Sequence, residues 1–387
     1  MSRFSLFSRP LTRVVAGAVA AASVAAVVAG CGDSGGGATD DGPVYFGVSG
    51  PRTGASAEYG RLWQQGFDIA LAEINAAGGI NGRKVELKWE DSQSDPKQTV
   101  PIATKFVDDK SIIAELGDFS SPASIAASPI YNRGKLVQYG FTNSAVDFTK
   151  GGPYSWSPSI TLDVFQERNA EWVSKKAKKV SVVYLETDWG KQAFQFFEKS
   201  AKQKGVDIVY SSPILPDSTD VKPILIKGRE ANPDAVVHLG YGPDGALVVK
   251  QLRDVGFTGQ FFGGQNTPQF ISLAGAAAEG DIVNGIFSPS DPDKKVQDFV
   301  TKFRAQFNTD PGDFNVYAYD ALHVLVQAAK KGGATREGIL AGLKTEKQFT
   351  GIGLGTFAFD QETRRPHGVA PRELVLAGGK FVPTGNR

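Results

Sequence analysis

Two kinds of hydrophobic pattern alternate along most of the chain. Short apolar runs rich in valine and isoleucine are typical of buried strands, and longer segments with helical spacing separate them. The clearest runs cover residues 44–48, 84–90, 112–116, 136–139, 180–184, 206–210 and 235–239. The helical segments cover residues 59–77, 97–109, 122–132, 163–175, 190–204, 221–230 and 244–255. Alternation of this kind predicts parallel sheets with helices on both faces.

The alternation occurs twice, with a break near Ile160. A chain of 387 residues also exceeds the size at which one hydrophobic core usually stops growing. We therefore predict an α/β fold with two doubly wound, Rossmann-like lobes. Further short strands are expected at residues 260–262 and 281–287. The last third of the chain predicts long helices at 294–308 and 315–331, and β-hairpins within 357–382.

The loops after the predicted strands carry small, hydroxylated or aromatic residues. They lie at residues 49–51, 118–122, 141–144, 188–190 and 240–242. Parallel α/β sheets bind ligands beyond the carboxyl ends of their strands. Ser120 and Ser121 stand at a helix start, where hydroxyl and free N–H groups can hold a carboxylate. One such loop usually only caps a helix, but five at the same strand ends favour a binding cleft.

The N-terminus has the pattern of an export signal. Arg3, Arg9 and Arg13 precede an uncharged, Ala- and Val-rich stretch at residues 14–28, which is too short for a typical membrane span. The following order Val-Ala-Gly-Cys resembles a bacterial lipobox, which is cut before a cysteine that receives diacylglycerol. We expect a signal peptide at 1–30, lipidation of Cys31, and a flexible tether over 31–43.

Composition and spacing argue against several other functions. The net charge of +1 lacks the basic excess of a nucleic-acid-binding protein. The single cysteine would be consumed by the lipid, and the three histidines, His238, His323 and His367, form no recognisable catalytic or metal-binding motif. The glycine-rich segment 351–355 precedes a predicted strand instead of the helix that a phosphate loop requires. We expect no enzymatic activity, no cofactor and no metal.

Three motifs resemble one family closely. They are GPRTG at residues 50–54, EINAAGGING at 73–82 and DPKQ at 95–98. With them, residues 44–383 resemble the branched-chain amino-acid binding proteins of ABC importers, which have the type I periplasmic-binding-protein fold. The resemblance implies two lobes that close on a solute, joined by crossovers near 159–162, 287–289 and 350–355. Lobe 1 would comprise 44–160 plus 288–350, and lobe 2 would comprise 161–287 plus 351–387.

The resemblance also implies a set of ligand-binding residues. The groups that hold the ligand carboxylate map onto Ser121, Thr142 and Ser144, with Ser120 as a close alternative. The aromatic residues of the cleft map onto Tyr59, Trp189 and Tyr241.

Gln265 falls where the amino-acid binders have the acid that receives the ligand ammonium. A neutral amide does not offset the desolvation of an ammonium group. Either another acid reaches the ligand, with Asp118 and Asp244 nearest by loop position, or the ligand has no ammonium. We expect the second case, with a small carboxylate or amide as ligand.

The resemblance implies an extracytoplasmic, lipid-anchored solute-binding protein that delivers its solute to the permease subunits of an ABC importer. We expect a monomer that does not bind nucleic acid. One alternative is a ligand-sensing protein that presents its solute to a receptor, and another is an enzyme. A receptor itself would need a membrane span and a signalling domain after the cleft, and neither is expected before Arg387.

Overall fold

A five-stranded parallel sheet forms the centre of the first lobe. The computed structural model describes residues 42–385, so the expected signal peptide and Cys31 lie outside the described residues. The strand order is β2-β1-β3-β4-β5. The strands are β1 (Val44–Gly50), β2 (Val85–Asp91), β3 (Ile112–Gly117), β4 (Val137–Tyr139) and β5 (Ser155–Trp156). Val44, Phe46 and Val48 of β1 are buried, as expected for a central strand covered on both faces.

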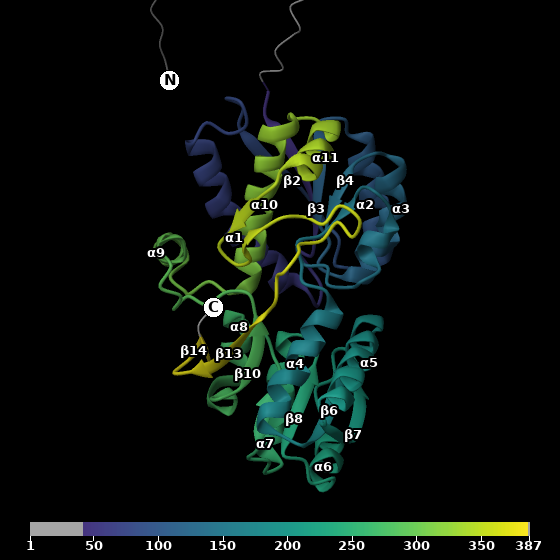
Figure 1. The fold of residues 1–387 in the computed structure, drawn as a ribbon, viewed down its shortest axis with the longest axis vertical. Coiled ribbons are helices and arrows are strands. Elements are labelled where there is room, and N and C mark those ends of the chain that lie inside the picture. The colour runs from purple at the N-terminus through teal and green to yellow at the C-terminus, as the bar shows by residue number, and fades with distance from the viewer. Residues whose placement is uncertain (1–41, 386–387) are drawn as a thin grey trace, which may run out of the picture. The chain divides into compact units, whose positions relative to one another are not determined.

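Helices cover both faces of this sheet (Figure 1). They are α1 (Ala57–Ala76), α2 (Pro96–Asp108), α3 (Ser121–Arg133), α10 (Asp313–Gly332) and α11 (Arg336–Thr345), while α9 (Lys294–Phe307) packs beside α1. Helices α1 and α10 approach closely at Gly66, where a Cβ atom would lie 2.1 Å from the carbonyl oxygen of Asn315. Glycine is therefore required for this contact. The sequence pattern did not reveal α11.

The second lobe contains a seven-stranded mixed sheet of order β14-β13-β10-β9-β8-β6-β7. Its parallel strands are β6 (Lys179–Leu185), β7 (Asp207–Ile214), β8 (Ala235–Leu239), β9 (Gln260–Phe262) and β10 (Ile282–Gly285). The hairpin of β13 (Arg372–Ala377) and β14 (Lys380–Pro383) adds antiparallel to β10. The helices of the second lobe are α4 (Leu162–Lys176), α5 (Asp188–Gln203), α6 (Lys222–Glu230), α7 (Gly242–Asp254) and α8 (Pro268–Ala274). The sequence pattern did not predict α8.

Three segments connect the lobes: 157–161, 286–293 and 358–371. The first two agree with the expected crossovers. The third lies later in the chain, because the hairpin of β11 (Phe349–Gly351) and β12 (Gly355–Phe357) packs in the first lobe. Phe349, Phe357 and Phe359 belong to the first-lobe hydrophobic core. Residues 351–359 therefore pack with lobe 1, whereas the sequence analysis placed them in lobe 2.

Two acids of α10 hold the backbone where the lobes meet. The Asp313 carboxylate accepts hydrogen bonds from the N–H groups of Ile286 and Phe287, at 3.3 and 3.2 Å. About two turns further along the helix, Asp320 accepts hydrogen bonds from the N–H groups of Ile352 and Gly353, both at 2.9 Å. Helix α10 therefore fixes both the second crossing and the tip of the β11–β12 hairpin.

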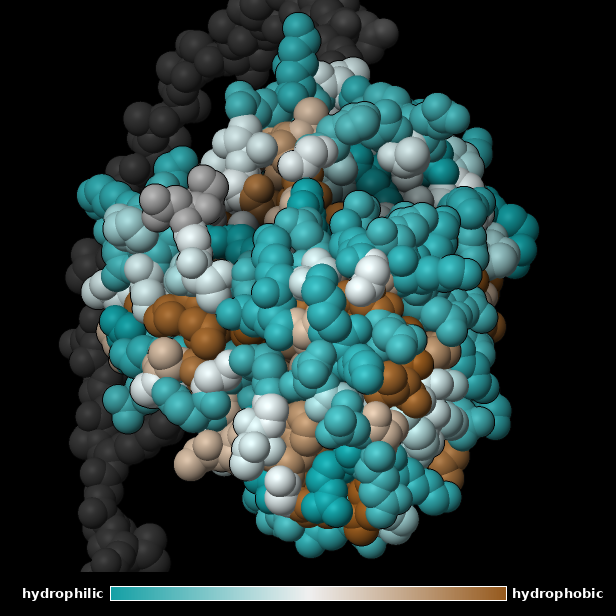
Figure 2. All heavy atoms as spheres, turned by 60° about the horizontal axis from the view of Figure 1, so that its bottom comes forward, coloured by the Kyte–Doolittle hydropathy of each residue, from teal (hydrophilic) through white to brown (hydrophobic). Residues whose placement is uncertain are grey.

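Hydrophobic side chains are scattered on the visible surface. On the face shown in Figure 2, brown areas are small and are separated by hydrophilic side chains. The large exposed hydrophobic residues among those described are Val100, Ile125, Leu215, Ile226 and Leu273. Isolated residues of this kind are normal for a folded surface and do not indicate a docking site. No helix within residues 42–385 is both long and apolar enough to cross a bilayer.

Candidate functional site

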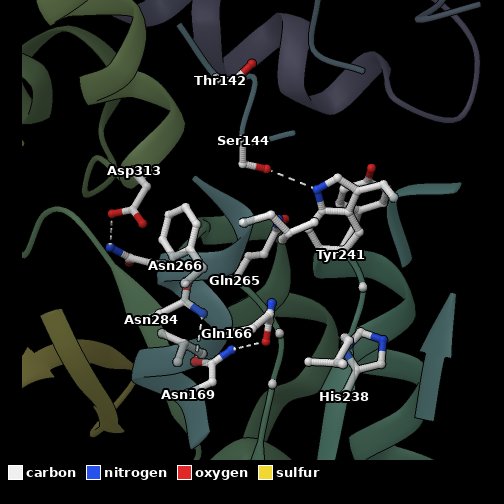
Figure 3. A pocket seen from close by; sticks show the side chains of 18 of the residues that line it. Thr142, Ser144, Gln166, Asn169, His238, Tyr241, Gln265, Asn266, Asn284 and Asp313 are labelled. Carbon is white, nitrogen blue, oxygen red and sulfur yellow. Dashed lines mark hydrogen bonds between the residues drawn. The ribbon is translucent and has the colours of Figure 1, made fainter. Parts of the chain in front are cut away.

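A cavity of about 130 Å³ lies between the two lobes, at the carboxyl ends of their parallel strands. For comparison, a 150 Å³ cavity can hold a benzene molecule. Six of the residues expected from the sequence line it: Ser121, Thr142, Ser144, Trp189, Tyr241 and Gln265. Four of them, Thr142, Ser144, Tyr241 and Gln265, are labelled in Figure 3. The cavity therefore has the size and position for a small solute held by both lobes.

Hydroxyl groups line the first-lobe side of the cavity. The Thr142 Oγ1 atom is buried and has no hydrogen-bond partner among the described residues. Ser144 Oγ accepts a hydrogen bond from Trp189 Nε1 at 3.1 Å, and Ser121 Oγ accepts one from the Ala145 N–H at 3.4 Å. Because these serine oxygens act as acceptors, their own O–H hydrogens can still be donated. Three hydroxyl donors are thus available to a ligand carboxylate.

The start of α3 adds to this anion-binding character. Ser121 is its first residue and follows the loop after β3. The first N–H groups of a helix have no partner within the helix, and its N-terminus carries partial positive charge. Both properties favour a carboxylate at this position.

Aromatic rings form the walls of the cavity. Trp189 lies in the first turn of α5, where the Thr187 side chain caps the helix by accepting from the Gly190 N–H at 3.1 Å. Its ring stacks on Tyr241, with centroids 5.2 Å apart. Phe119, which the sequence analysis did not single out, also lines the cavity and lies 5.4 Å from the Tyr241 ring. These rings offer flat apolar surfaces to a ligand.

Tyr59 and Ser120 are not among the lining residues. Tyr59 is buried behind the cavity, where its hydroxyl donates to Gln265 Oε1 at 2.5 Å and accepts from the Gly242 N–H at 3.2 Å. The Ser120 N–H donates to Asp118 Oδ1 at 3.0 Å. Tyr59 thus supports a lining residue, and Ser120 belongs to the loop that precedes α3.

The Gln265 amide has a defined orientation. Its Oε1 atom accepts from the Gly242 N–H at 3.0 Å and from the Tyr59 hydroxyl. Because a backbone N–H can only donate, the oxygen must face Gly242 and the nitrogen must face away. Nε2 has no hydrogen-bond partner within residues 42–385, so it can donate to a ligand. The site presents a donor where an ammonium would need an acceptor.

Neither acid suggested by loop position lines the cavity. Asp118 is buried beneath the first-lobe loops and accepts from Ser92 and the Ser120 N–H, and burial raises its pKa to about 6. Asp244 interacts with His238 Nε2 at 2.8 Å and accepts from the Tyr241 N–H at 3.0 Å. Both carboxylates are occupied by structural contacts.

Asp313 is the carboxylate that does line the cavity, and sequence reasoning did not find it. Besides the two backbone N–H groups of the crossing, it accepts from Asn266 Nδ2 at 2.7 Å. Burial raises its pKa to about 7. These three donors indicate that Asp313 stabilises the hinge. Most of the hydrogen-bonding capacity of its carboxylate is used by protein groups.

A row of amides lines the second-lobe side of the cavity: Gln166 and Asn169 on α4, and Asn284 on β10. The sequence analysis missed them, although Gln166 and Asn169 stand three residues apart and therefore share a helix face. Asn284 interrupts the apolar run of β10. No group of three metal-ligating side chains was found among the described residues.

A model of the periplasmic binding protein family matches residues 43–372. Leu/Ile/Val-binding protein homolog 1 of Brucella melitensis is 29% identical over 327 residues, covering 82% of this chain and 86% of the relative. A Pseudomonas aeruginosa protein named amino acid binding protein is 30% identical over 302 residues, covering 75% and 79%.

A similar solved structure is the branched-chain amino acid transporter substrate binding protein LivJ of Streptococcus pneumoniae in complex with isoleucine. It has a TM-score of 0.81 and 27% identity, and the match covers 88% of this chain and 97% of that chain. Its fold agrees with the two doubly wound lobes expected from the sequence. Because the family model matches most of the chain, this chain belongs to the periplasmic binding protein family.

Proposed function

We propose that this protein is the extracytoplasmic solute-binding component of an ABC importer and captures a small carboxylate or amide by hinge closure. The observation that carries the proposal is the cavity, whose walls take hydrogen-bonding groups from both lobes. A solute held by both lobes stabilises the closed form over the open form. The closed protein then delivers the solute to the membrane permease of the importer.

The two lobes have different roles in this mechanism. Ser121, Thr142 and Ser144 hold the ligand carboxylate on the first lobe. Trp189 and Tyr241 then cover the ligand from the second lobe as the hinge closes. Burial of an aromatic or aliphatic ligand body against these rings would contribute about 2 kcal/mol to binding.

The preferred ligand lacks an ammonium group. Gln265 offers a donor to the cavity, and Asp118 and Asp244 lie outside its lining. A branched-chain amino acid is the second candidate, because the relatives carry names of amino-acid binders and Asp313 lines the same cavity. Asp313 already accepts three hydrogen bonds, which favours the first candidate.

The cellular location of the protein is a separate part of the proposal. Residues 1–30 would act as a signal peptide, and Cys31 would carry the lipid that holds a monomeric protein beside its permease. Substitution Cys31→Ser should release the protein from the membrane fraction of cells. Unchanged membrane retention of this variant would contradict lipid anchoring.

A thermal-shift screen of the purified protein tests the ligand class, with branched-chain amino acids, amides, and aliphatic and aromatic acids. A solute at 100 times its Kd should add about 2.7 kcal/mol to the free energy of unfolding. We expect shifts with nitrogen-free acids or amides. Strong shifts with leucine or valine alone would overturn the ligand preference, and no shift with any solute would overturn solute binding.

A further inference from the structure

The second-lobe amides form one hydrogen-bonded chain. Asn284 Nδ2 donates to Asn169 Oδ1 at 2.9 Å, and Asn169 Nδ2 donates to Gln166 Oε1 at 2.9 Å. We call these three residues the amide relay. It joins helix α4 to strand β10 inside the second lobe.

The relay ends on an unsatisfied donor. Because Gln166 Oε1 accepts from Asn169, the Gln166 nitrogen points the other way, and it has no hydrogen-bond partner within residues 42–385. Figure 3 shows this nitrogen directed toward the middle of the cavity. Gln166 is only 3% exposed as a residue, and its side chain lines the cavity. A ligand oxygen at this position would therefore gain a hydrogen bond from an amide group that the protein already holds in place.

The relay faces the carboxylate-binding side across the cavity. Thr142 and Ser144 lie on one side in Figure 3 and the amides lie on the other, with Gln265 and Tyr241 between them. Gln265 presents a second amide nitrogen from the same lobe. A ligand whose carboxylate meets the hydroxyls would therefore place its far end near two neutral N–H donors.

We propose that the amide relay is a second polar subsite, which selects small carboxylic acids that carry a carbonyl or another oxygen acceptor at the end away from the carboxylate. The inference rests on the proposed function and adds the chemical class of the ligand. Neutral donors suit a neutral oxygen, whereas a distal ammonium would meet hydrogen atoms instead of lone pairs.

Matched ligands test the subsite by isothermal titration calorimetry on the full-length protein in detergent. The probes are oxo acids with the carbonyl at carbon 3, 4 or 5, for example 4-oxopentanoate. Each is compared with the plain acid of equal length, such as pentanoate, and with a terminal amino acid, such as 5-aminopentanoate. The best oxo acid should bind about 5- to 10-fold more tightly than its plain acid, as expected for one added hydrogen bond.

Gln166→Leu removes the donor at a similar side-chain size. It should reduce the ratio of oxo-acid to plain-acid affinity to below about twofold. Gln64→Leu, on α1 and outside the cavity lining, is the matched control and should keep the wild-type ratio.

Asn169→Asp provides a second variant in case Gln166→Leu does not fold. An aspartate at this position accepts from both neighbours, which turns the Gln166 oxygen toward the cavity. The preference should then move from the oxo acid toward the amino acid. A general loss of packing would instead weaken all three acids and leave their order unchanged.

Several results would overturn the subsite. They are equal binding of oxo and plain acids to the wild type, an unchanged ratio in Gln166→Leu, or a wild-type preference for the terminal amino acid. Failure of every acid to bind would instead remove the proposed function, and this inference with it.

Discussion

The indole N–H of Trp189, in the second lobe, donates to the hydroxyl oxygen of Ser144, in the first lobe, over 3.1 Å. The same indole ring stacks on Tyr241 within its own lobe. One side chain thus joins the hydroxyl-bearing loop of the first lobe to the aromatic wall of the cavity in the second lobe. Closure of the two lobes and assembly of the site are therefore coupled through Trp189.

Substitution Trp189→Phe should weaken solute binding about 2- to 10-fold. Phenylalanine keeps a ring for Tyr241 but removes the hydrogen bond to Ser144, which contributes about 0.5–1.5 kcal/mol to the closed form. Calorimetric titration with the strongest acid from the ligand screen measures the effect. Trp172→Phe, in the second-lobe core, is the control and should leave the affinity unchanged. Equal affinities of both variants would refute the coupling.

Thr142→Val should weaken binding without destabilising the free protein. The Thr142 hydroxyl is buried without a partner, so an isosteric valine removes an unsatisfied group. Chemical denaturation should give an equal or higher free energy of unfolding, while titration shows lower affinity for carboxylates. Thr99→Val is the contrasting control, because Thr99 Oγ1 donates to the Asp95 carbonyl at 2.7 Å in α2. That variant should lose stability and keep its affinity.

Gln265→Glu should reverse the ligand preference. A carboxylate can still accept from Gly242 and Tyr59, but its second oxygen replaces the amide donor that faces the cavity. Nitrogen-free acids should bind at least about tenfold more weakly, because a like charge enters the site, whereas leucine should gain affinity. Titrations of both ligand types measure the change. Tighter binding of the nitrogen-free acid would contradict the proposed ligand class.

Arg365 should prove to be a positioning residue for the carboxylate-binding loop. Its buried guanidinium donates to the carbonyl groups of Asn143, Ala145 and Ser159, at 3.0, 2.6 and 3.0 Å. It thereby ties that loop to the first crossing. Arg365→Met removes these three hydrogen bonds and leaves the Ser159 carbonyl without a donor among the described residues, although the Asn143 and Ala145 carbonyls still accept from Ser157 Oγ and the Phe148 N–H. It should lower the free energy of unfolding by about 3 kcal/mol, together with solute affinity.

The matched control for Arg365 is Arg336→Met. Arg336 also donates to backbone carbonyls, those of Phe106, Val107, Asp109 and Ile112, but at the other end of the first lobe. This control should lose stability while its affinity stays within about twofold of the wild type, as expected for a distant site. If both variants lost affinity equally, the effect at Arg365 would be a general consequence of instability.

Asp281→Asn should make stability less dependent on pH. Asp281 is fully buried, and burial raises its pKa to about 8, although Arg253 lies 3.6 Å away. Its folded-state pKa exceeds the unfolded value of about 3.9, so its contribution to stability is full at low pH. That contribution is lost as the pH rises between about 4 and 8, with a slope of at most about 1.4 kcal/mol per pH unit.

Denaturant unfolding between pH 4 and pH 9 measures this dependence. The Asn variant should lose less stability over the range than the wild type does. Asp207→Asn, at an exposed position of β7, removes the same charge without burial and should follow the wild-type curve. A variant curve parallel to the wild type would show that Asp281 is already ionised at low pH.

Periodicity predicted most of the elements because each strand and helix had an apolar pattern of adequate length. The predicted strand 235–239 and helix 244–255 correspond to β8 and α7. The short helix α8 was missed because 7 residues give little periodic signal. Helix α11 was also missed, although it is one residue longer than α6, which was predicted. The third crossing was placed too early, because the aromatic hairpin 349–357 packs in lobe 1 through contacts that are distant in sequence.

Six of the eight expected site residues line the cavity because parallel sheets bring the ends of their strands together. Loop position could not show that Tyr59 lies behind the cavity instead of lining it. That placement depends on contacts of the Tyr59 hydroxyl with Gly242 and Gln265 in the opposite lobe. It also suggested Asp118 and Asp244, whose carboxylates the fold directs into other hydrogen bonds. Asp313 is the first residue of helix α10 and does not follow a strand, so a search of the loops after strands could not find it.

The sequence by itself determined the layered α/β architecture, the two lobes and the hydroxylated and aromatic loops, because these follow from local patterns and chain order. Only the tertiary structure decided which way the polar groups face. The Gln265 amide is oriented by a backbone N–H from α7 and a hydroxyl from α1, and the Gln166 amide is linked through Asn169 to the Asn284 side chain of β10. Hydrogen-bond direction depends on partners far apart in the chain, and that direction decides whether the site presents donors or acceptors to its ligand.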